Sequence, residues 1–228
     1  MAMSLSVNDL LDLKQTDHAL LFQHCHYPWE ALSKIGAYLG EHLRPSRFGK
    51  VHTSSIMEGA VYIGEGTVID PNVYIKGPAW IGKNCQIRQG AYLRGNVIAG
   101  DGCVLGNSCE FKNCILFNEA QVPHFAYVGD SILGYHSHLG SGVTLSNLKI
   151  TSGNVEIVVN GEKIDSGLRK FGAIIGDHAE AGCHCVLNPG SVLGRRSILY
   201  PGVSWRGICP PDMVVKLKQE HTLVSRMA

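Results

Sequence analysis

A six-residue repeat of apolar positions runs along most of the chain. From Ile63 to Phe111, every sixth residue is apolar, and the residue two places before it is small or β-branched. A second run keeps the same step from Ile175 to Trp205, and residues 128–145 continue the pattern between the two runs with one step of five. A step of six matches neither the 3.6-residue period of a helix nor the two-residue period of a strand. It predicts short strands joined by similar turns.

Three sides of six residues make one coil of eighteen, and successive coils stack at the parallel-strand spacing of ~4.8 Å. The predicted fold is therefore an all-β solenoid, a left-handed parallel β-helix of hexapeptide repeats, over residues 56–209. Four cysteines occupy the small-residue positions of the repeat, and as small apolar side chains we expect them to fill its corners. They are Cys85, Cys103, Cys109 and Cys185.

Three segments fall outside the repeat. Residues 1–55 contain stretches with the apolar spacing of helices, which predicts a helical N-terminal cap over the first coil. Residues 146–172 break the period, and Asn160-Gly161 between two short apolar runs predicts a β-hairpin in a loop ejected from the solenoid. Residues 210–228 are predicted to form a tail with a short C-terminal helix.

Composition narrows the classes of function. The 228 residues are 45% hydrophobic and carry 20 basic and 19 acidic side chains, so the formal charge is +1. That balance does not favour nucleic acid as a partner, and no apolar run is long enough to span a bilayer. The start of the chain does not resemble a signal peptide, and the eight cysteines are then expected to be reduced. We expect a cytoplasmic protein without a membrane partner.

Three basic residues, Lys76, Arg94 and Lys112, are spaced eighteen apart and each follows an inward apolar residue. One coil per eighteen residues would stack them about 5 Å apart along one edge, where like charges repel unless an anion lies among them or solvent screens them. Two interpretations remain open from spacing alone. Arg94 and Lys112 form a phosphate clamp, or the column is a solvated ladder of corner residues.

Histidines offer two further kinds of chemistry. His124 follows Pro123 where the six-residue register fails, so it is either an exposed general base or an ordinary loop histidine. His136 and His138 alternate along the chain, and with His124 they motivate a γ-class carbonic-anhydrase-like metalloenzyme as an alternative. No third ligand of fixed spacing accompanies them, so no metal site is predicted.

Ordered motifs over about half of the chain resemble one family. The segments are Leu93-Arg94, residues 106–112, His124-Phe-Ala-Tyr-Val-Gly-Asp130, residues 139–142, Asn147 and residues 169–177. They resemble the acetyltransferase domain of the bacterial bifunctional enzyme glucosamine-1-phosphate N-acetyltransferase/N-acetylglucosamine-1-phosphate uridyltransferase. They resemble still more closely the β-helical half of archaeal sugar-1-phosphate nucleotidyltransferases.

The resemblance implies a role for each matched residue. His124 corresponds to a general base that takes a proton from the sugar amine during direct transfer from acetyl-CoA, with no metal required. Other matched positions correspond to residues that grip the acceptor phosphate (Arg94, Lys112, Lys170), orient the acceptor (Tyr127, Asn147) and contact coenzyme A (Cys183, Pro201). The family's acceptor-pocket asparagine falls at His138, which leaves the acceptor sugar open.

The resemblance therefore implies a CoA-dependent N-acetyltransferase of nucleotide-sugar biosynthesis that acts on an amino-sugar phosphate such as glucosamine-1-phosphate. It also implies a homotrimer with active sites between neighbouring prisms. The family's nucleotidyltransferase domain has no counterpart in this sequence. A non-catalytic partner or regulatory subunit of a sugar nucleotidyltransferase is thus a second alternative.

Overall fold

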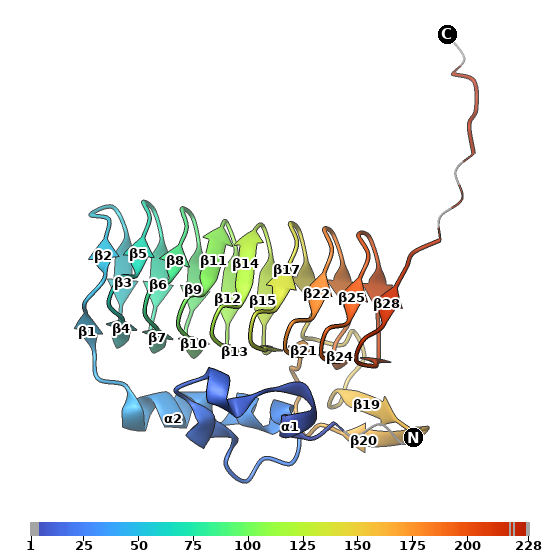
Figure 1. Cartoon of the computed structure of the whole chain (residues 1–228), viewed down its shortest axis with the longest axis horizontal. Helices are drawn as coiled ribbons and strands as arrows, with labels where there is room; N and C mark the ends of the chain where they lie inside the picture. Colours follow the sequence, from blue (N-terminus) through green and yellow to red (C-terminus); the bar gives the residue numbers. More distant parts are fainter. Residues whose placement is uncertain (1–4, 219, 221, 227–228) are drawn as a thin grey trace.

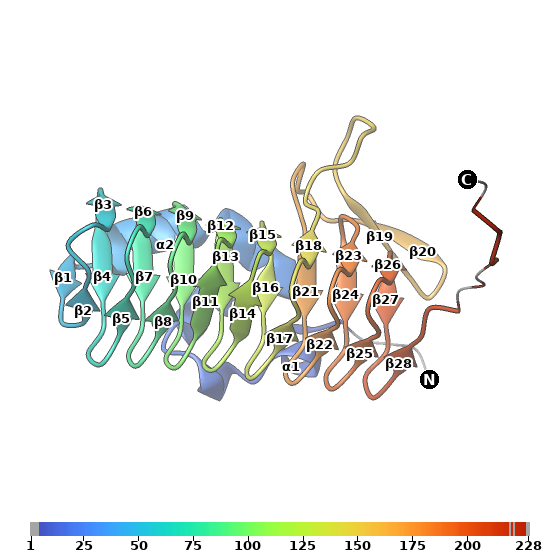
Figure 2. The ribbon, with the colours of Figure 1, turned by 90° about the horizontal axis from the view of Figure 1, so that it is seen from above.

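The computed structural model describes residues 5–218, 220 and 222–226, and most of these residues form a parallel β-solenoid with three sheets (Figures 1 and 2). Sheet A contains β1 (Ser46–Arg47), β4 (Val61–Ile63), β7 (Ala79–Ile81), β10 (Val97–Ala99), β13 (Cys114–Leu116), β16 (Ile132–Leu133), β21 (Ala173–Ile175), β24 (Ser191–Leu193) and β27 (Ile208–Cys209). Sheet B contains β2 (Lys50–Val51), β5 (Val68–Ile69), β8 (Gln86–Ile87), β11 (Val104–Asn107), β14 (Gln121–His124), β17 (His138–Leu139), β22 (Glu180–Ala181), β25 (Ile198–Leu199) and β28 (Val214–Val215). Sheet C contains β3 (Ile56–Glu58), β6 (Tyr74–Lys76), β9 (Tyr92–Arg94), β12 (Glu110–Lys112), β15 (Tyr127–Gly129), β18 (Thr144–Leu145), β23 (Val186–Leu187) and β26 (Ser204–Trp205).

The six-step positions form the core of the solenoid. Every residue of the first run, from Ile63 to Phe111, has at most 1% of its surface exposed, and the corner cysteines of the repeat are buried as well. The parallel pairing of strands one coil apart confirms the predicted solenoid, whose left-handed sense stays a prediction. Burial raises the pKa of the Cys103 thiol, in keeping with its role as an apolar corner filler.

The coils are not all eighteen residues long. Tyr92 pairs with Glu110, eighteen residues later, but Glu110 pairs with Tyr127, only seventeen residues later. The missing residue is lost after Phe111, because Leu116 takes the next inward place five positions on. This shortening brings Gly129 opposite Lys112 at the end of β15.

The N-terminal segment lies along the outer surface of sheet A (Figure 1), and the expectation that it caps the first coil is wrong. It contains α1 (Val7–Leu10), η1 (Leu13–Gln15), η2 (Ala19–Phe22), η3 (Pro28–Ser33) and α2 (Ile35–His42), of which the η elements are 3₁₀ helices. Apolar side chains on the outer surface of sheet A explain its position. Ile98, Ile115, Ile132, Ile174 and Val192 stand in register on successive strands and pack against this segment.

The solenoid also begins and ends beyond its predicted bounds of 56–209. Strands β1 and β2 lie within the predicted cap, and β28 lies within the predicted tail. In the tail, residues 210–218 contain no helix, because Val214 pairs with Ile198 of the preceding coil and extends sheet B. None of the helices formed by the described residues is long and apolar enough to cross a membrane.

Polar contacts hold the N-terminal segment against several coils of the solenoid. The Asp12 amide donates to the Asp177 carboxylate at 2.7 Å, and the Asp177 amide donates to the Leu10 carbonyl at 3.0 Å. His18 is buried between the rings of Tyr38 and Trp80, with its Nδ1 3.0 Å from the Tyr38 hydroxyl. Desolvation lowers the pKa of His18 to about 4.

The ejected loop contains the predicted hairpin. Strands β19 (Glu156–Val159) and β20 (Glu162–Asp165) pair antiparallel, and Asn160 and Gly161 at the turn both have positive φ, at 50° and 87°. These values suit a two-residue turn of the type favoured between twisted strands. Ile157 packs its buried side chain into the same apolar cluster as the N-terminal segment, so the hairpin lies beside that segment rather than in solvent.

Candidate functional site

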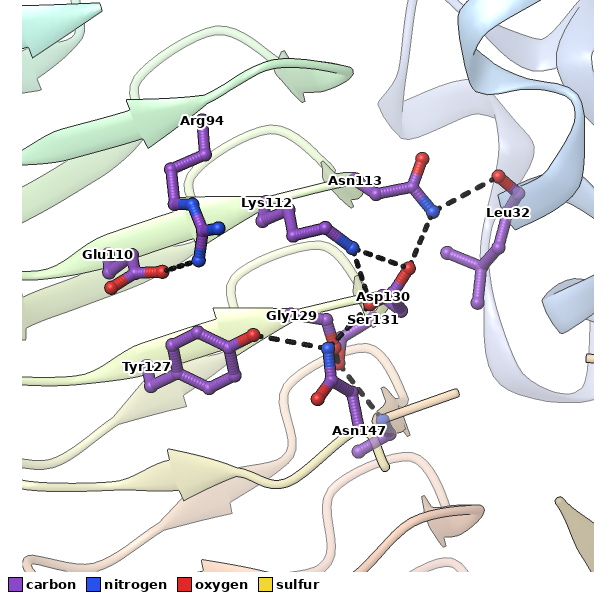
Figure 3. A network of polar contacts seen from close by, with 11 residues as sticks. Leu32, Arg94, Glu110, Lys112, Asn113, Tyr127, Gly129, Asp130, Ser131 and Asn147 are labelled. Atoms are coloured by element: carbon purple, nitrogen blue, oxygen red, sulfur yellow. Dashed lines mark hydrogen bonds and ion pairs between the residues drawn. The ribbon is translucent and has the colours of Figure 1, made fainter. Parts of the chain in front are cut away.

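A polar network occupies the corner where sheet C leads into sheet A (Figure 3). At its centre is Asp130, whose side chain is 7% exposed. Its carboxylate accepts hydrogen bonds from Lys112 Nζ at 3.1 Å, from Asn113 Nδ2 at 2.9 Å and from Asn147 Nδ2. One buried carboxylate thus connects the end of β12, the following corner and the segment after β18.

The basic column predicted at this edge is present, and two of its three charges already have carboxylate partners in the same chain. Lys76 stands in register with Arg94 on the next strand. Arg94 pairs with Glu110, which raises the pKa of the guanidinium, and Lys112 pairs with Asp130. Carboxylates of the same chain therefore already balance Arg94 and Lys112, and the phosphate clamp stays a prediction.

Tyr127 joins the network from the middle of sheet C. Its hydroxyl accepts a hydrogen bond from Asn147 Nδ2 at 3.1 Å, and burial raises the pKa of the phenol, so it stays neutral at physiological pH. Gly129 makes this contact possible. A Cβ at that position would lie 2.5 Å from the Tyr127 hydroxyl oxygen and 2.6 Å from Asn147 Nδ2.

Lys170 lies next to the network on the returning end of the ejected loop. It is exposed and forms a bridge with Leu148, while the amide of the following residue, Phe171, donates to the Asn147 carbonyl at 2.9 Å. The N-terminal segment supports this region from behind. Trp29 packs on Phe171 with ring centroids 5.6 Å apart, and the Leu32 carbonyl accepts a hydrogen bond from Asn113 at 3.3 Å.

His124 lies at the opposite edge of sheet C, exposed at the end of β14. The carbonyl of His124 accepts from the Gly142 amide, and the next coils continue the same corner with Cys183 and Pro201. Both of these residues are exposed. The structure therefore gathers the expected base and the expected coenzyme positions along one corner, and the expected phosphate and acceptor residues along the other.

The remaining histidines do not join His124. His138 lies on sheet B in register with Gln121, and His136 lies at the corner between sheets A and B with a positive φ of 52°. His136 Nε2 is 4.0 Å from a carboxylate oxygen of Glu119. Within residues 5–218, 220 and 222–226, no three His, Cys, Asp or Glu side chains gather into a group that could hold a metal ion.

Four residues of the network were not singled out from the sequence. They are Glu110, Asn113, Gly129 and Asp130. Spacing along the chain was a usable signal for Glu110 and Asp130. Asp130 follows Lys112 by eighteen residues and Glu110 follows Arg94 by sixteen, and both spacings are close to the length of one coil. Both pairs of opposite charge are therefore brought together by neighbouring coils.

Comparison of the sequence with known proteins finds relatives that match most of the chain. A family model described as the GMPPB C-terminal domain matches residues 75–166. The bifunctional protein GlmU of Methanococcus aeolicus is 35% identical over 193 residues, which are 85% of this chain and 46% of that protein. The bifunctional sugar-1-phosphate nucleotidylyltransferase/acetyltransferase of Sulfurisphaera tokodaii is 31% identical over 205 residues, covering 87% of this chain and 51% of that protein.

Among solved structures, the UDP-N-acetylglucosamine acyltransferase of Francisella novicida matches with a TM-score of 0.41 and 17% identity, covering 76% of this chain and 65% of that one. The chain spans about half the length of the bifunctional relatives it matches. The repeat, the solenoid and these sequence matches agree with the resemblance found in the motifs. The chain is a hexapeptide-repeat β-solenoid protein that is 31–38% identical to about half of the sequence of GlmU-type bifunctional proteins.

Proposed function

We propose that this chain is a CoA-dependent N-acetyltransferase that acts on an amino-sugar phosphate such as glucosamine-1-phosphate. The observation that carries the proposal is the network of Lys112, Asp130, Asn147 and Tyr127, which is separated from the exposed His124 by the single strand β15. These residues supply a cation, two orienting polar groups and a base. Those are the groups that acyl transfer to a phosphorylated amine requires.

The acceptor would lie across sheet C. Strand β15 separates the two corners, and its three residues span about 10 Å at the usual rise per residue. A hexosamine phosphate bound across this strand would direct its phosphate toward Lys112 and Lys170 and its amine toward His124. Lys170 forms no ion pair with any carboxylate of the described residues, so it is the cation most available to the phosphate.

In the reaction, the amine nitrogen attacks the thioester carbonyl of acetyl-CoA, and His124 takes the proton released from nitrogen. The carbon–sulfur bond then breaks, CoA leaves as its thiol after accepting a proton, and the acetyl group forms an amide with the sugar. No acyl-enzyme forms. Orientation and base catalysis supply the acceleration in this mechanism.

The decisive experiment measures CoA thiol release with acetyl-CoA and a panel of hexosamine phosphates. We expect His124→Ala to lower kcat by at least about 100-fold, the usual contribution of a general base, while acceptor binding measured by calorimetry is retained. His136→Ala, at a different corner, is the matched control and should keep full activity. Full activity of His124→Ala, or absence of turnover with every hexosamine phosphate, would refute the proposal.

A second candidate function is that of a non-catalytic partner of a sugar nucleotidyltransferase. Acceptor binding without any acyl transfer, together with co-purification of a nucleotidyltransferase, would favour this candidate over the enzyme.

We also propose that the chain is a cytoplasmic homotrimer in which Cys183 and Pro201 contact CoA near the next subunit. Light scattering coupled to size exclusion tests the trimer.

A further inference from the structure

A cavity of about 340 Å³ lies between the ejected loop and the solenoid, and none of the residues that line it belongs to the network of Asp130. The loop contributes Lys149, Glu156, Ile157 and Lys163 to its walls, and the coils contribute the corners at Pro189 and Arg206. We propose that this cavity is a second anion site, which binds the phosphate or diphosphate group of an organic ligand. Binding of the anion does not depend on the function proposed above.

The charge of the cavity favours an anion. Three cations, Lys149, Lys163 and Arg206, face one carboxylate, and that carboxylate, on Glu156, is 3.4 Å from Lys163. No carboxylate of the described residues forms an ion pair with Lys149 or Arg206. The cavity therefore contrasts with the edge of sheet C, where Arg94 and Lys112 both have carboxylate partners.

The partial burial of Lys149, which has no ion-pair partner among the described residues, indicates which kind of ligand the cavity would bind. Lys149 is half-buried, and a cation removed from water without a counter-ion is destabilising unless an anion compensates it. Lys149 comes from the loop, whereas Arg206 comes from a coil of the solenoid and is exposed, so the loop and the solenoid each contribute a cation to the cavity. A group with several oxygen atoms and two or more negative charges suits such an arrangement better than a single carboxylate.

The walls also carry apolar surface. Val158, which lines the cavity, is 53% exposed and Pro189 lines it at the adjacent corner, so an apolar or ring-shaped part of the ligand can pack beside the cations. This combination of features fits an organic phosphate better than an inorganic ion.

The cavity is next to the candidate acceptor site along the same edge. Lys149 follows Asn147 by two residues, and Arg169, the neighbour of Lys170, donates to the Lys149 carbonyl at 3.5 Å. The corner at Arg206 is two coils from the segment that holds Asn147, which corresponds to about 10 Å. Under the proposed function, both reactants carry phosphate, and either could place a phosphate here.

The test measures binding directly, without turnover. The full chain is titrated calorimetrically with pyrophosphate, CoA, dephospho-CoA and glucosamine-1-phosphate. We expect Lys149→Gln/Arg206→Gln to weaken pyrophosphate binding at least about tenfold, since each charge-assisted contact is worth that much or more. The salt dependence of binding should fall in the same variant. Lys50→Gln, an exposed residue of β2, is the control and should bind as the wild type does.

The organic ligands distinguish the sources of the phosphate. A loss of affinity for CoA but not for dephospho-CoA assigns the cavity to the 3′-phosphate, and a loss for glucosamine-1-phosphate assigns it to the acceptor. Equal losses for pyrophosphate and both forms of CoA assign it to the diphosphate. Circular dichroism and an unchanged Tm show that the double variant is folded. Wild-type protein that fails to bind any of these ligands, or a folded double variant that binds all of them as the wild type does, overturns the proposal.

Discussion

Replacement of Asp130 tests whether one buried carboxylate holds the candidate acceptor site together. Asp130→Ala removes the shared acceptor of Lys112, Asn113 and Asn147, whereas Asp130→Asn keeps the shape but loses the charge. We expect both variants to fold, because the solenoid core does not include this side chain. We also expect both to lose affinity for an amino-sugar phosphate, since Lys112 and Asn147 would lose the charged acceptor that orients them.

The size of the effect follows from the contacts that remain. A hydrogen bond to a charged group contributes about 1.5–3 kcal/mol, so three such bonds set an upper limit. The side chain of Lys112 is 26% exposed and can turn to water, Asn113 still donates to the Leu32 carbonyl, and Asn147 still donates to the Tyr127 hydroxyl. We therefore expect the free energy of unfolding to fall by about 2–4 kcal/mol for Asp130→Ala and by about 1–2 kcal/mol for Asp130→Asn.

Urea unfolding at pH 7, followed by tryptophan fluorescence, measures these changes, and a constant m-value shows that the compared states are the same. Asp212→Asn is the matched control, because Asp212 also forms an ion pair, with Arg196 at 2.6 Å, but is exposed. That pair is open to solvent, and we expect no measurable change. If Asp130→Ala is as stable as the control variant and binds the acceptor as tightly as the wild type, the organising role of Asp130 is refuted.

Three further predictions concern other parts of the same framework. Gly129→Ala should lower the free energy of unfolding by about 1–3 kcal/mol and weaken acceptor binding, because its Cβ would push Tyr127 and Asn147 apart. Urea unfolding measures the change in stability, and calorimetry measures the change in binding. If neither quantity changes, the corner adapts to the added methyl group. The pKa of His18 is about 4 in the native state and 6.5 ordinarily, so the native imidazole holds its proton less tightly than the unfolded chain does. Stability should therefore fall by about 3 kcal/mol as the pH drops from 6.5 toward 4, and less steeply in His18→Phe, as denaturation curves at several pH values would show. Asp177→Ala should lower the free energy of unfolding by about 2–4 kcal/mol, since the Asp12 amide loses its acceptor. It should also make the N-terminal segment more sensitive to limited proteolysis.

The core was predictable from the sequence because each side of each coil contributes one inward side chain. A step of six therefore identifies residues such as Leu93 and Leu105 directly. The position of the N-terminal segment was not predictable in the same way. A helical apolar pattern shows that one face of the segment will be buried, but not which surface it packs against. The outward-facing column that includes Ile98 cannot be recognised from the sequence, because its strands are apolar on both faces.

The basic and acceptor-orienting residues of the candidate site were predictable from the sequence, but the carboxylates that pair with its cations were not. Coil spacing and family resemblance placed Arg94 and Lys112 on one edge. Whether a neighbouring carboxylate reaches each cation depends on side-chain reach and on the shortened coil, which brings Asp130 to the corner beside Lys112. A count of eighteen residues per coil does pair Lys112 with Asp130, but it places Asp130 opposite Lys112 on the strand, where the structure has Gly129.

The N-terminal segment also changes how the solenoid is expected to come apart. In a repeat protein each coil contacts only its neighbours, so the ends can fray while the centre stays folded. Here a single segment contacts the solenoid from β7 to the corner after β21, through Trp80 near one end and Asp177 toward the other. The segment connects many coils, so opening one coil also disrupts contacts of the segment with the others. We therefore expect the solenoid to unfold cooperatively, as one unit.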